Sequence, residues 1–335
     1  MQQYQPKNIL VTGGAGFIGA NFVHHILKTD SNINVINLDL LTYAGKKENL
    51  NQLADPSRHV FIQGDICDRG LVDKLLRQHQ IDTIVHFAAE SHVDRSIIGP
   101  EAFVKTNVLG TFTLLEAART YWLQEQQWDK NRCRFHHIST DEVYGMLSAS
   151  DPAFTEETPY APNSPYSASK AGSDHLVRAY FHTYGLPVTT SNCSNNYGPY
   201  QDKEKLIPKI IDACLQNKPI PVYGQGLNIR DWLYVADHCT AIDTIIRQGV
   251  LGETYNIGGN NEIRNIDVVY AICDLMEEKS SAQINYRNLI TFVQDRPGHD
   301  WRYAINNGKI SQQLNWQPSV KFEQGLKQTI NWYCQ

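Results

Sequence analysis

The stretch that decides the fold is Asn8–Gly19, NILVTGGAGFIG. It opens with a short apolar, β-branched run, which is typical of a buried strand. A turn containing Gly13, Gly16 and Gly19 follows, and the apolar residues of 17–28 then recur at helical spacing. Glycine allows a tight turn and lets a pyrophosphate approach the backbone, where the helix N-terminus offers N–H donors and a positive dipole. The stretch therefore predicts the first βα unit of a dinucleotide-binding domain.

The same alternation of strand and helix continues along the first half of the chain. We expect further strands at residues 34–39, 59–63, 83–87 and 134–139, and helices at about 68–79, 102–124 and 165–184. Buried strands that alternate with helices indicate an α/β fold with a Rossmann-type, doubly wound parallel sheet. Ser164 and Pro165 form a favourable helix start, and Gly185 a favourable stop.

The pattern loosens after about residue 195, where prolines and glycine turns divide the chain into shorter pieces. Helices are expected there at about 205–217, 235–248, 265–278 and 321–333. We therefore predict a dinucleotide-binding domain over residues 1–195 and a smaller substrate-binding lobe over residues 196–335, some segments of which return to the first domain.

Composition excludes several classes of protein. The 335 residues are 41% hydrophobic and 19% charged, with a net charge of −5, which is typical of a soluble globular protein and argues against a general binder of nucleic acid or membrane surfaces. The seven cysteines form no CxxC pair and are odd in number, which disfavours a zinc site or a disulfide framework and favours a reducing, cytoplasmic location. No apolar run approaches the ~20 residues of a membrane span. Because the first expected strand begins at Asn8, we expect no signal peptide.

An acidic residue supports the dinucleotide site. Asp39 ends the second expected strand, 20 residues after Gly19. A carboxylate there can accept hydrogen bonds from a ribose 2′-hydroxyl and repels a 2′-phosphate, so NAD is favoured over NADP. The alternative is a glycine turn with an unrelated acid at a strand end. Asp65 and Ile66, after the third strand, are candidate adenine contacts.

Tyr166 and Lys170 form a candidate redox pair. They are four residues apart on an expected helix and so share one face. A nearby ammonium ion favours the phenolate, which could take a hydroxyl proton while hydride leaves the same carbon. Thr140, at the end of the fifth strand, could bind the reacting oxygen. The alternative is an unremarkable surface pair with a turn threonine.

Asp141 and Glu142 form a candidate acid/base pair at the C-terminal end of the fifth strand, the edge where open α/β sheets bind ligands. In an extended strand their side chains would point to opposite faces, so both can reach one substrate only if the backbone turns here. Two neighbouring carboxylates disfavour double ionisation, which would leave one acid and one base. The alternative is a solvated Asp-Glu turn.

Longer segments support a family resemblance. Among them are VTGGAGFIG, HFAAESHVDRSI, ISTDEVYG, SPYSASKAGSD, NNYGPYQ and RDWLYV. Together they resemble the extended short-chain dehydrogenase/reductase family over nearly the whole chain, and within it the dTDP-glucose 4,6-dehydratases. The resemblance implies a lyase with NAD as cofactor, which oxidises C4 of a nucleotide-linked glucose, eliminates water across C5–C6 and returns hydride to C6. Sugar-nucleotide 4-epimerases or decarboxylases and a non-catalytic NAD-sensing protein are the alternatives.

The resemblance also assigns residues. The catalytic set comprises Thr140 at the C4 oxygen, Asp141 as the acid at C6, Glu142 as the base at C5, and Tyr166 with Lys170 for oxidation. NAD contacts are expected from Gly13, Gly16, Phe17, Ile18, Gly19, Asp39, Leu40, Leu41, Thr42, Asp65, Ile66, Phe87, Ala88, Ala89, Glu90, Ser91, Thr106, Tyr166, Lys170 and Asn196. Contacts to the sugar nucleotide, with dTDP-glucose expected, come from Ser91, Thr140, Asn195, Lys205, Leu206, Pro221, Val222, Tyr223, Arg230, Asn265, Asp295, Arg296, Pro297, Gly298 and His299. No metal site is expected.

Some positions depart from the family pattern. Asp202-Lys203 stands where the family usually has Phe-Pro, and Trp301 and Asn306 also differ, which leaves the shape of the nucleotide pocket and the choice between thymine and uracil open. We interpret His86, His92, His136 and His137 as structural. The helices at about 102–124 and 166–184 resemble the pair through which the family forms homodimers, although their apolar residues could equally face the sheet.

Overall fold

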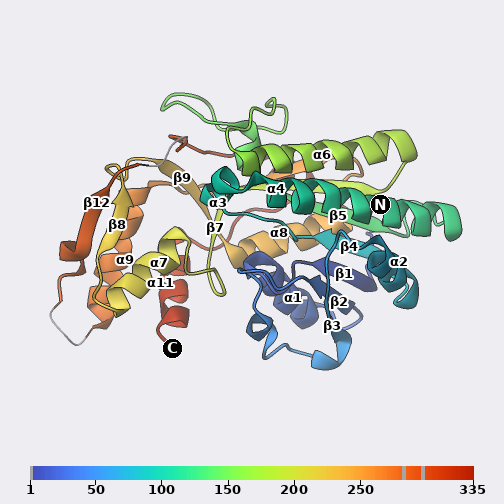
Figure 1. The fold of residues 1–335 in the computed structure, drawn as a ribbon, viewed down its shortest axis with the longest axis horizontal. Helices are drawn as coiled ribbons and strands as arrows, with labels where there is room; N and C mark the ends of the chain where they lie inside the picture. The colour runs from blue at the N-terminus through green and yellow to red at the C-terminus, as the bar shows by residue number, and fades with distance from the viewer. Residues whose placement is uncertain (1–2, 281–283, 296–298) are drawn as a thin grey trace.

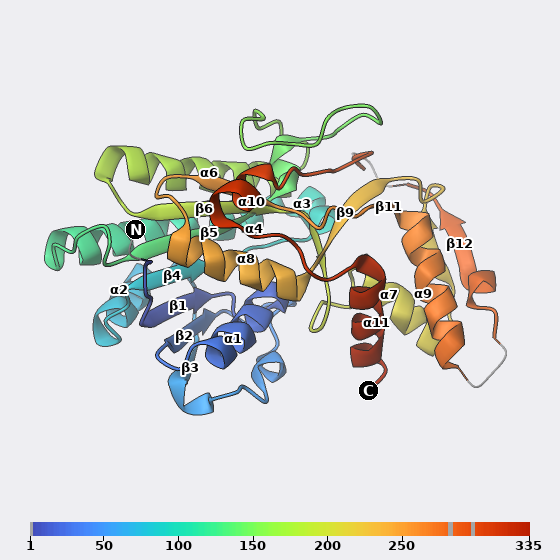
Figure 2. The same cartoon turned by 180° about the vertical axis from the view of Figure 1, so that it is seen from behind.

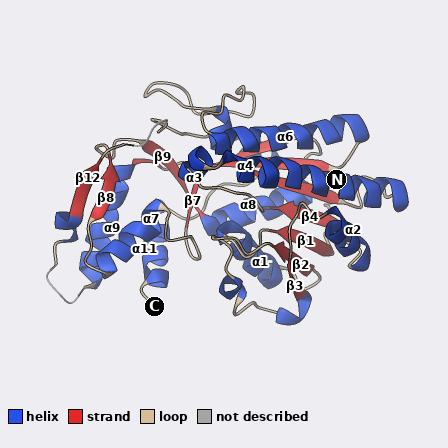
Figure 3. Cartoon of the chain, viewed as in Figure 1, coloured by secondary structure: helices blue, strands red, loops and turns tan. Residues whose placement is uncertain are grey.

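A seven-stranded parallel sheet organises the first part of the molecule (Figures 1 and 3). The computed structural model describes residues 3–280, 284–295 and 299–335. The strand order is β10-β6-β5-β4-β1-β2-β3. Successive strands are added to one side of β1 up to β3 and then, from β4, to its other side, and this change of side lies beside the glycine loop. The predicted Rossmann-type fold is therefore confirmed. The strands are β1 (Asn8–Thr12), β2 (Asn34–Asp39), β3 (His59–Gln63), β4 (Thr83–His86), β5 (Arg134–Thr140), β6 (Val188–Cys193) and β10 (Thr254–Ile257).

Helices bury both faces of this sheet because its strands are apolar on both sides. Along β1, Leu10 packs into a core shared with α2 (Arg69–Gln78), α5 (Thr111–Ala118) and α6 (Pro165–Tyr184). Its neighbours Ile9 and Val11 point the other way, into a core shared with α1 (Phe17–Thr29) and α8 (Val235–Gln248). The alternation of side chains along one strand thus supplies two hydrophobic cores.

The stretch before β5 departs from the single helix predicted at 102–124. Helix α3 (Val93–Ile98) lies before the predicted range and was not predicted. Helix α4 (Pro100–Phe103) overlaps the start of that range. The backbone then widens into π-helical turns at Val104–Gly110 and Arg119–Glu125, on either side of α5. Apolar periodicity detects the helical stretch but not its local pitch, which depends on neighbours distant in sequence.

The C-terminal lobe lies beyond the carboxyl edge of the sheet, at the left of Figure 1. Its core joins α7 (Leu206–Leu215), α9 (Asn265–Lys279) and α11 (Phe322–Tyr333). Two small sheets complete it, with strand orders β11-β9-β7 and β12-β8. These strands are β7 (Asn195–Tyr197), β8 (Ile220–Tyr223), β9 (Ile229–Tyr234), β11 (Glu262–Arg264) and β12 (Ile290–Val293).

Later segments pack against the large sheet and its helices, as Figure 2 shows for α8 and for α10 (Gly308–Leu314). Strand β10 pairs with β6 in parallel, and α8 packs on α1. The large sheet is thus completed by chain that follows residue 195. No helix within the described residues is both long enough and apolar enough to span a membrane.

Candidate active site

The glycine turn after β1 approaches the loop after β4 too closely for any side chain. Gly13 has φ +71°, and a Cβ placed on it would lie 2.6 Å from the backbone nitrogen of Ala88. A Cβ on Gly19 would lie 2.3 Å from the carbonyl oxygen of Gly13. Both positions require glycine, the first for its dihedral angle and for space, the second for space.

Asp39 closes the same corner of the site. Its carboxylate accepts hydrogen bonds from the backbone N–H groups of Ala15, at 2.9 Å, and Leu41, at 2.8 Å. Burial raises the pKa of Asp39, and the two N–H donors oppose this. The Ala15 bond ties the end of β2 to the glycine turn and holds the acid beside it, at the position predicted for a ribose contact.

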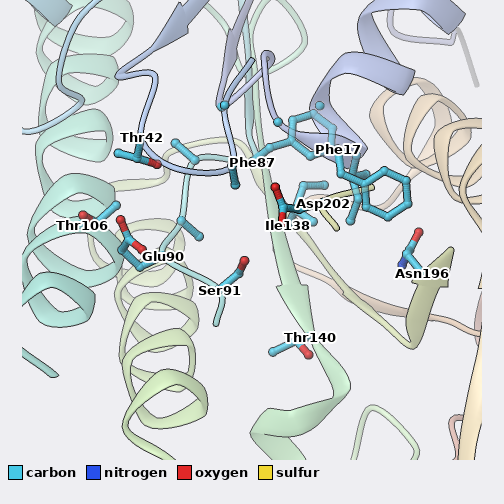
Figure 4. A pocket seen from close by; sticks show the side chains of 18 of the residues that line it. Phe17, Thr42, Phe87, Glu90, Ser91, Thr106, Ile138, Thr140, Asn196 and Asp202 are labelled. Atoms are coloured by element: carbon cyan, nitrogen blue, oxygen red, sulfur yellow. The ribbon is translucent and has the colours of Figure 1, made fainter. Parts of the chain in front are cut away.

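A cavity of about 310 Å³ runs from the glycine turn to the end of β5. Figure 4 shows Thr106, Glu90 and Ser91 along one side, Phe17 and Asn196 along the other, and Thr140 near the end of β5. Every residue predicted to contact NAD lines this cavity except Leu41, whose N–H bonds to Asp39 instead. The close approach at Gly13 and the carboxylate at the end of β2 fit a dinucleotide.

The chain turns directly after β5, as the acid/base hypothesis required. Thr140 caps a short 3-10 helix, Asp141–Tyr144, and its Oγ1 accepts a hydrogen bond of 3.3 Å from the Glu142 N–H. Because of this turn, Thr140, Asp141 and Glu142 all line the one cavity, together with Tyr166 and Lys170. The five predicted catalytic residues are therefore brought together.

The two carboxyl groups have different surroundings. Asp141 is buried, and its Oδ1 is 3.4 Å from Thr140 Oγ1, while no group within the described residues hydrogen-bonds its Oδ2. Burial raises the pKa of Asp141 well above its usual value, and the charges of Glu142 and Asp231 raise it further. Glu142 is only half-buried. The environment thus favours a proton on Asp141, which suits an acid.

The Tyr166–Lys170 pair differs from expectation in one respect. Both residues lie on α6, which starts at the capping Ser164 and ends at Gly185 as predicted. Lys170 Nζ, however, donates a 2.8 Å hydrogen bond to the carbonyl oxygen of Ile138. Burial, followed by the charge of Glu142, raises the pKa of Tyr166 well above its usual value. In this state the tyrosine is a phenol, because desolvation outweighs any stabilisation of the phenolate by the lysine.

The predicted substrate contacts fall into two groups. Ser91, Thr140, Asn195 and Lys205 line the cavity, and Lys205 Nζ donates to the carbonyl oxygen of Ser91 at 3.2 Å. The others outside the cavity lining belong to the C-terminal lobe: Leu206, Pro221, Val222, Tyr223, Arg230, Asn265, Asp295 and His299. Arg296, Pro297 and Gly298 lie outside the described residues.

Within the second group, two local arrangements stand out. Arg230 is buried on β9, donates to the carbonyl oxygen of Asp300 at 2.8 Å and stacks on the Tyr303 ring at 4.4 Å. His299 Nδ1 lies 2.7 Å from Asp295 Oδ1. The expected contact between Arg230 and the sugar nucleotide remains a prediction.

Sequence reasoning missed part of the lining, including Tyr43, Cys193, Gln201, Asp202 and Glu204. Asp202 departs from the family pattern, and its Oδ2 lies 3.7 Å from Lys46 Nζ. Gln201 ends the quoted segment NNYGPYQ but was assigned no role there, and the others come to the cavity from segments that lie far apart in the sequence.

The histidines interpreted as structural have protein partners. His136 and His86 are buried, and each ring bonds to two hydroxyl side chains: Thr189 and Ser191 for His136, Thr12 and Thr111 for His86. His92 Nε2 lies 3.4 Å from Glu204.

Comparison with known proteins places this architecture in a family. The model of the GDP-mannose 4,6 dehydratase family matches residues 10–329. This chain belongs to that family. Curated dTDP-glucose 4,6-dehydratases are similar to it throughout: that of Salmonella typhimurium is 55% identical over 97% of this chain and 92% of its own, and that of Neisseria meningitidis serogroup B is 56% identical over 98% and 93%.

Solved structures agree with this placement. The dTDP-glucose 4,6-dehydratase of Bacillus anthracis, in complex with NAD, is 46% identical with a TM-score of 0.86, covering 97% of this chain and 96% of its own. A UDP-glucose 4-epimerase from Thermotoga maritima shares the fold at 26% identity and a TM-score of 0.85, covering 98% of each chain. The resemblance to the extended short-chain dehydrogenase/reductases is confirmed.

Proposed function

We propose that this chain catalyses the NAD-dependent dehydration of dTDP-glucose to the 4-keto-6-deoxy sugar nucleotide. The observation that carries the proposal is the turn at Thr140–Glu142, which brings an acid and a base into the cavity that already holds Tyr166 and Lys170. The dTDP-glucose 4,6-dehydratases that are similar to this chain, including one from Streptomyces venezuelae solved with NAD and dTDP, support the substrate.

The glycine turn and Asp39 would hold NAD, with Phe17 and Ile18 at the start of α1 and Thr106 across the cavity. Bound NAD would accept hydride from C4 of the sugar and give it back at C6. The chain itself supplies the binding, the orientation and the proton transfers.

The four proton-handling groups have separate tasks. Tyr166 would take the C4 hydroxyl proton, and Thr140 would donate a hydrogen bond to the C4 oxygen. The pKa of Tyr166 is raised in this state, and the cationic nicotinamide ring of bound NAD would oppose that shift by favouring the phenolate. Glu142 would then remove the C5 proton, which the C4 ketone has made acidic. Asp141 would protonate the departing C6 hydroxyl.

The distribution of roles between Asp141 and Glu142 follows from their surroundings. Burial and two neighbouring carboxylates raise the pKa of Asp141 and favour its protonated form. Glu142 is more exposed to solvent and so retains charge at lower cost. An acid beside a base is what β-elimination of water requires, whereas 4-epimerisation on the same fold needs only the oxidation step.

The test is to incubate the purified protein separately with dTDP-glucose, UDP-glucose and GDP-mannose and to detect the 4-keto product. Turnover of dTDP-glucose is expected. With dTDP-glucose deuterated at C4, mass spectrometry should find the label at C6 of the product. Formation of the C4 epimer, or loss of the label to solvent, would contradict the proposal.

We further propose that the protein is a homodimer. An apolar groove lies over Val104–Gly110, α5 and α6, lined by Glu101, Val104, Lys105, Val108, Leu109, Phe112 and Leu176. Val104, Leu109 and Phe112 are 56%, 47% and 42% exposed, so they face away from the sheet. A contiguous apolar patch of this kind is typical of an interface, and a two-fold axis would pair it with its copy.

Light scattering at micromolar concentration tests the dimer. Phe112→Glu should yield a monomer, whereas Val250→Glu, at an exposed apolar position in the loop after α8, should leave the dimer intact. A wild-type protein that is monomeric throughout would exclude this interface.

A further inference from the structure

A buried carboxylate, which sequence reasoning did not single out, lies one helical turn beyond Lys170. Asp174 on α6 is 6% exposed. Ser139 Oγ and Tyr160 OH donate to its Oδ2 at 2.7 and 3.0 Å, and His137 Nε2 lies 3.0 Å from its Oδ1. The burial of Asp174 opposes its ionisation, but the hydrogen bond from His137 and the charge of Lys170 prevail, so its pKa is lowered.

His137 stands between Asp174 and Lys170. Its Nε2 is also 3.5 Å from Lys170 Nζ. Because an ionised carboxylate can only accept, the Nε2 must carry the proton that it shares with Asp174. Burial, with the charge of Lys170, lowers the pKa of His137 to about 4, so the ring is neutral near pH 7. The net charges of this network are therefore those of Asp174 and Lys170.

Lys170 needs such a counter-charge. Its side chain is 4% exposed, and burial lowers its pKa, which Asp174 opposes. A buried ammonium ion without a counter-charge tends to lose its proton rather than stay charged. The hydrogen bond to Ile138 aims the group but contributes no net charge. Lys170 also lines the cofactor cavity, so its charge bears directly on binding there.

The other titratable groups around Lys170 offer no substitute. His86 on β4 has a pKa lowered by burial and by His137, so the ring is neutral. Burial raises the pKa of Cys193 on β6 to about 12, so its thiol is neutral as well. Tyr166, on the same helix, keeps its proton in this state. His86, Cys193, Tyr166 and His137 are thus all neutral, whereas Asp174 carries a negative charge.

We propose that Asp174 is a positioning residue, the buried counter-charge that keeps Lys170 an ammonium ion directed into the cofactor cavity. The inference rests on the proposed use of NAD. It adds to that proposal a further carboxylate, which acts through Lys170 and touches neither substrate nor cofactor.

The experiment measures NAD binding against pH rather than turnover. Equilibrium dialysis would give the NAD dissociation constant of the full-length wild type, Asp174→Asn, Asp174→Glu and Tyr160→Phe between pH 6 and 10. In Asp174→Asn, Lys170 should lose its proton at a lower pH than in wild type. Between pH 7 and 9 the NAD dissociation constant of this variant should therefore rise about tenfold relative to that of the wild type. Asp174→Glu retains the charge and should follow the wild-type curve.

Tyr160→Phe is the matched control, because it removes a hydrogen bond to Asp174 without removing charge. It should change NAD affinity equally at all pH values. Parallel curves for Asp174→Asn and Tyr160→Phe would overturn the proposal and leave Asp174 a structural residue. Product formation from dTDP-glucose by the wild type tests the dehydratase function separately, so the two ideas can fail independently.

A second measurement avoids any dependence on the folding of Asp174→Asn. In wild-type protein labelled with [13Cε]lysine, the resonance of Lys170 is assigned by its loss in Lys170→Arg. It should report an ammonium ion at about pH 8, as its counter-charge requires. A neutral amine at that pH would refute the proposal.

Discussion

Replacing Asp141 by asparagine should abolish most activity without loss of stability. Asparagine has nearly the same shape but cannot give a proton to the departing C6 hydroxyl. Removing a positioned general acid lowers kcat by about 10²–10⁴-fold. The loss should appear in kcat rather than in NAD binding, because the glycine turn and Asp39 are untouched.

The effect on stability follows from the surroundings of the carboxyl group. The substitution loses at most one long hydrogen bond, at 3.4 Å from Thr140, and such a bond contributes about 0.5–1.5 kcal/mol or less. Against this, the pKa of Asp141 is higher in the folded protein than in the unfolded chain, first because of burial and then because of Glu142 and Asp231. Each unit of such a shift costs about 1.4 kcal/mol once the group is ionised.

The sign of the pH dependence follows from this difference. With a raised pKa, the folded state binds the proton more tightly than the unfolded state, so the stability contributed by Asp141 is complete below the unfolded pKa. It is lost as the pH rises toward the folded pKa. Asparagine does not titrate. The free energy of unfolding of Asp141→Asn should therefore increase relative to wild type as the pH rises.

Urea unfolding at pH 5 and pH 8, with turnover measured on the same samples, tests both statements. Asp237→Asn is the matched control, because Asp237 is also buried but accepts backbone N–H bonds of 3.0 and 2.9 Å from Ser319 and Val320 and does not contribute to the pKa of Asp141. It should be destabilised. Near-normal turnover of Asp141→Asn would refute the acid role, and a stability difference independent of pH would refute the electrostatic reasoning.

Three further outcomes are expected. Glu142→Gln should bind NAD and dTDP-glucose normally but form product about 10²–10⁴-fold more slowly, and ¹H NMR should show no exchange of the C5 hydrogen; exchange would assign the base elsewhere. Gly13→Ala should lose bound NAD, because its Cβ would lie 2.6 Å from the Ala88 nitrogen at φ +71°, and NAD retained through gel filtration would contradict this. Asp39→Ala should raise the affinity for NADP relative to NAD, as measured by dialysis, since the acid that repels a 2′-phosphate is gone; an unchanged ratio would argue against that contact.

The sequence predicts the bounds of a strand or helix best where adjacent residues alone determine that element. The bounds of β1, β2 and β3 and those of α8 match the prediction, because a short apolar run between turn residues, or an apolar stripe at helical spacing, is a property of adjacent residues. The small strands of the C-terminal lobe, such as β7 and β11, were not predicted. They are short and are held by pairing with β9, so their sequences carry little pattern of their own.

The residues alone predict five of the seven strands of the nucleotide-binding sheet, without β6 and β10, together with the glycine turn and its acid and the requirement that the chain turn after Thr140. Only the tertiary structure decided the state of the groups that meet there. Burial, Glu142 and Asp231 raise the pKa of Asp141. His137 lies within 3.0 Å of Asp174 and 3.5 Å of Lys170, whose Nζ donates to the Ile138 carbonyl oxygen. Desolvation and Coulomb interaction act through space between strands and helices far apart in the chain, and so no local motif encodes them.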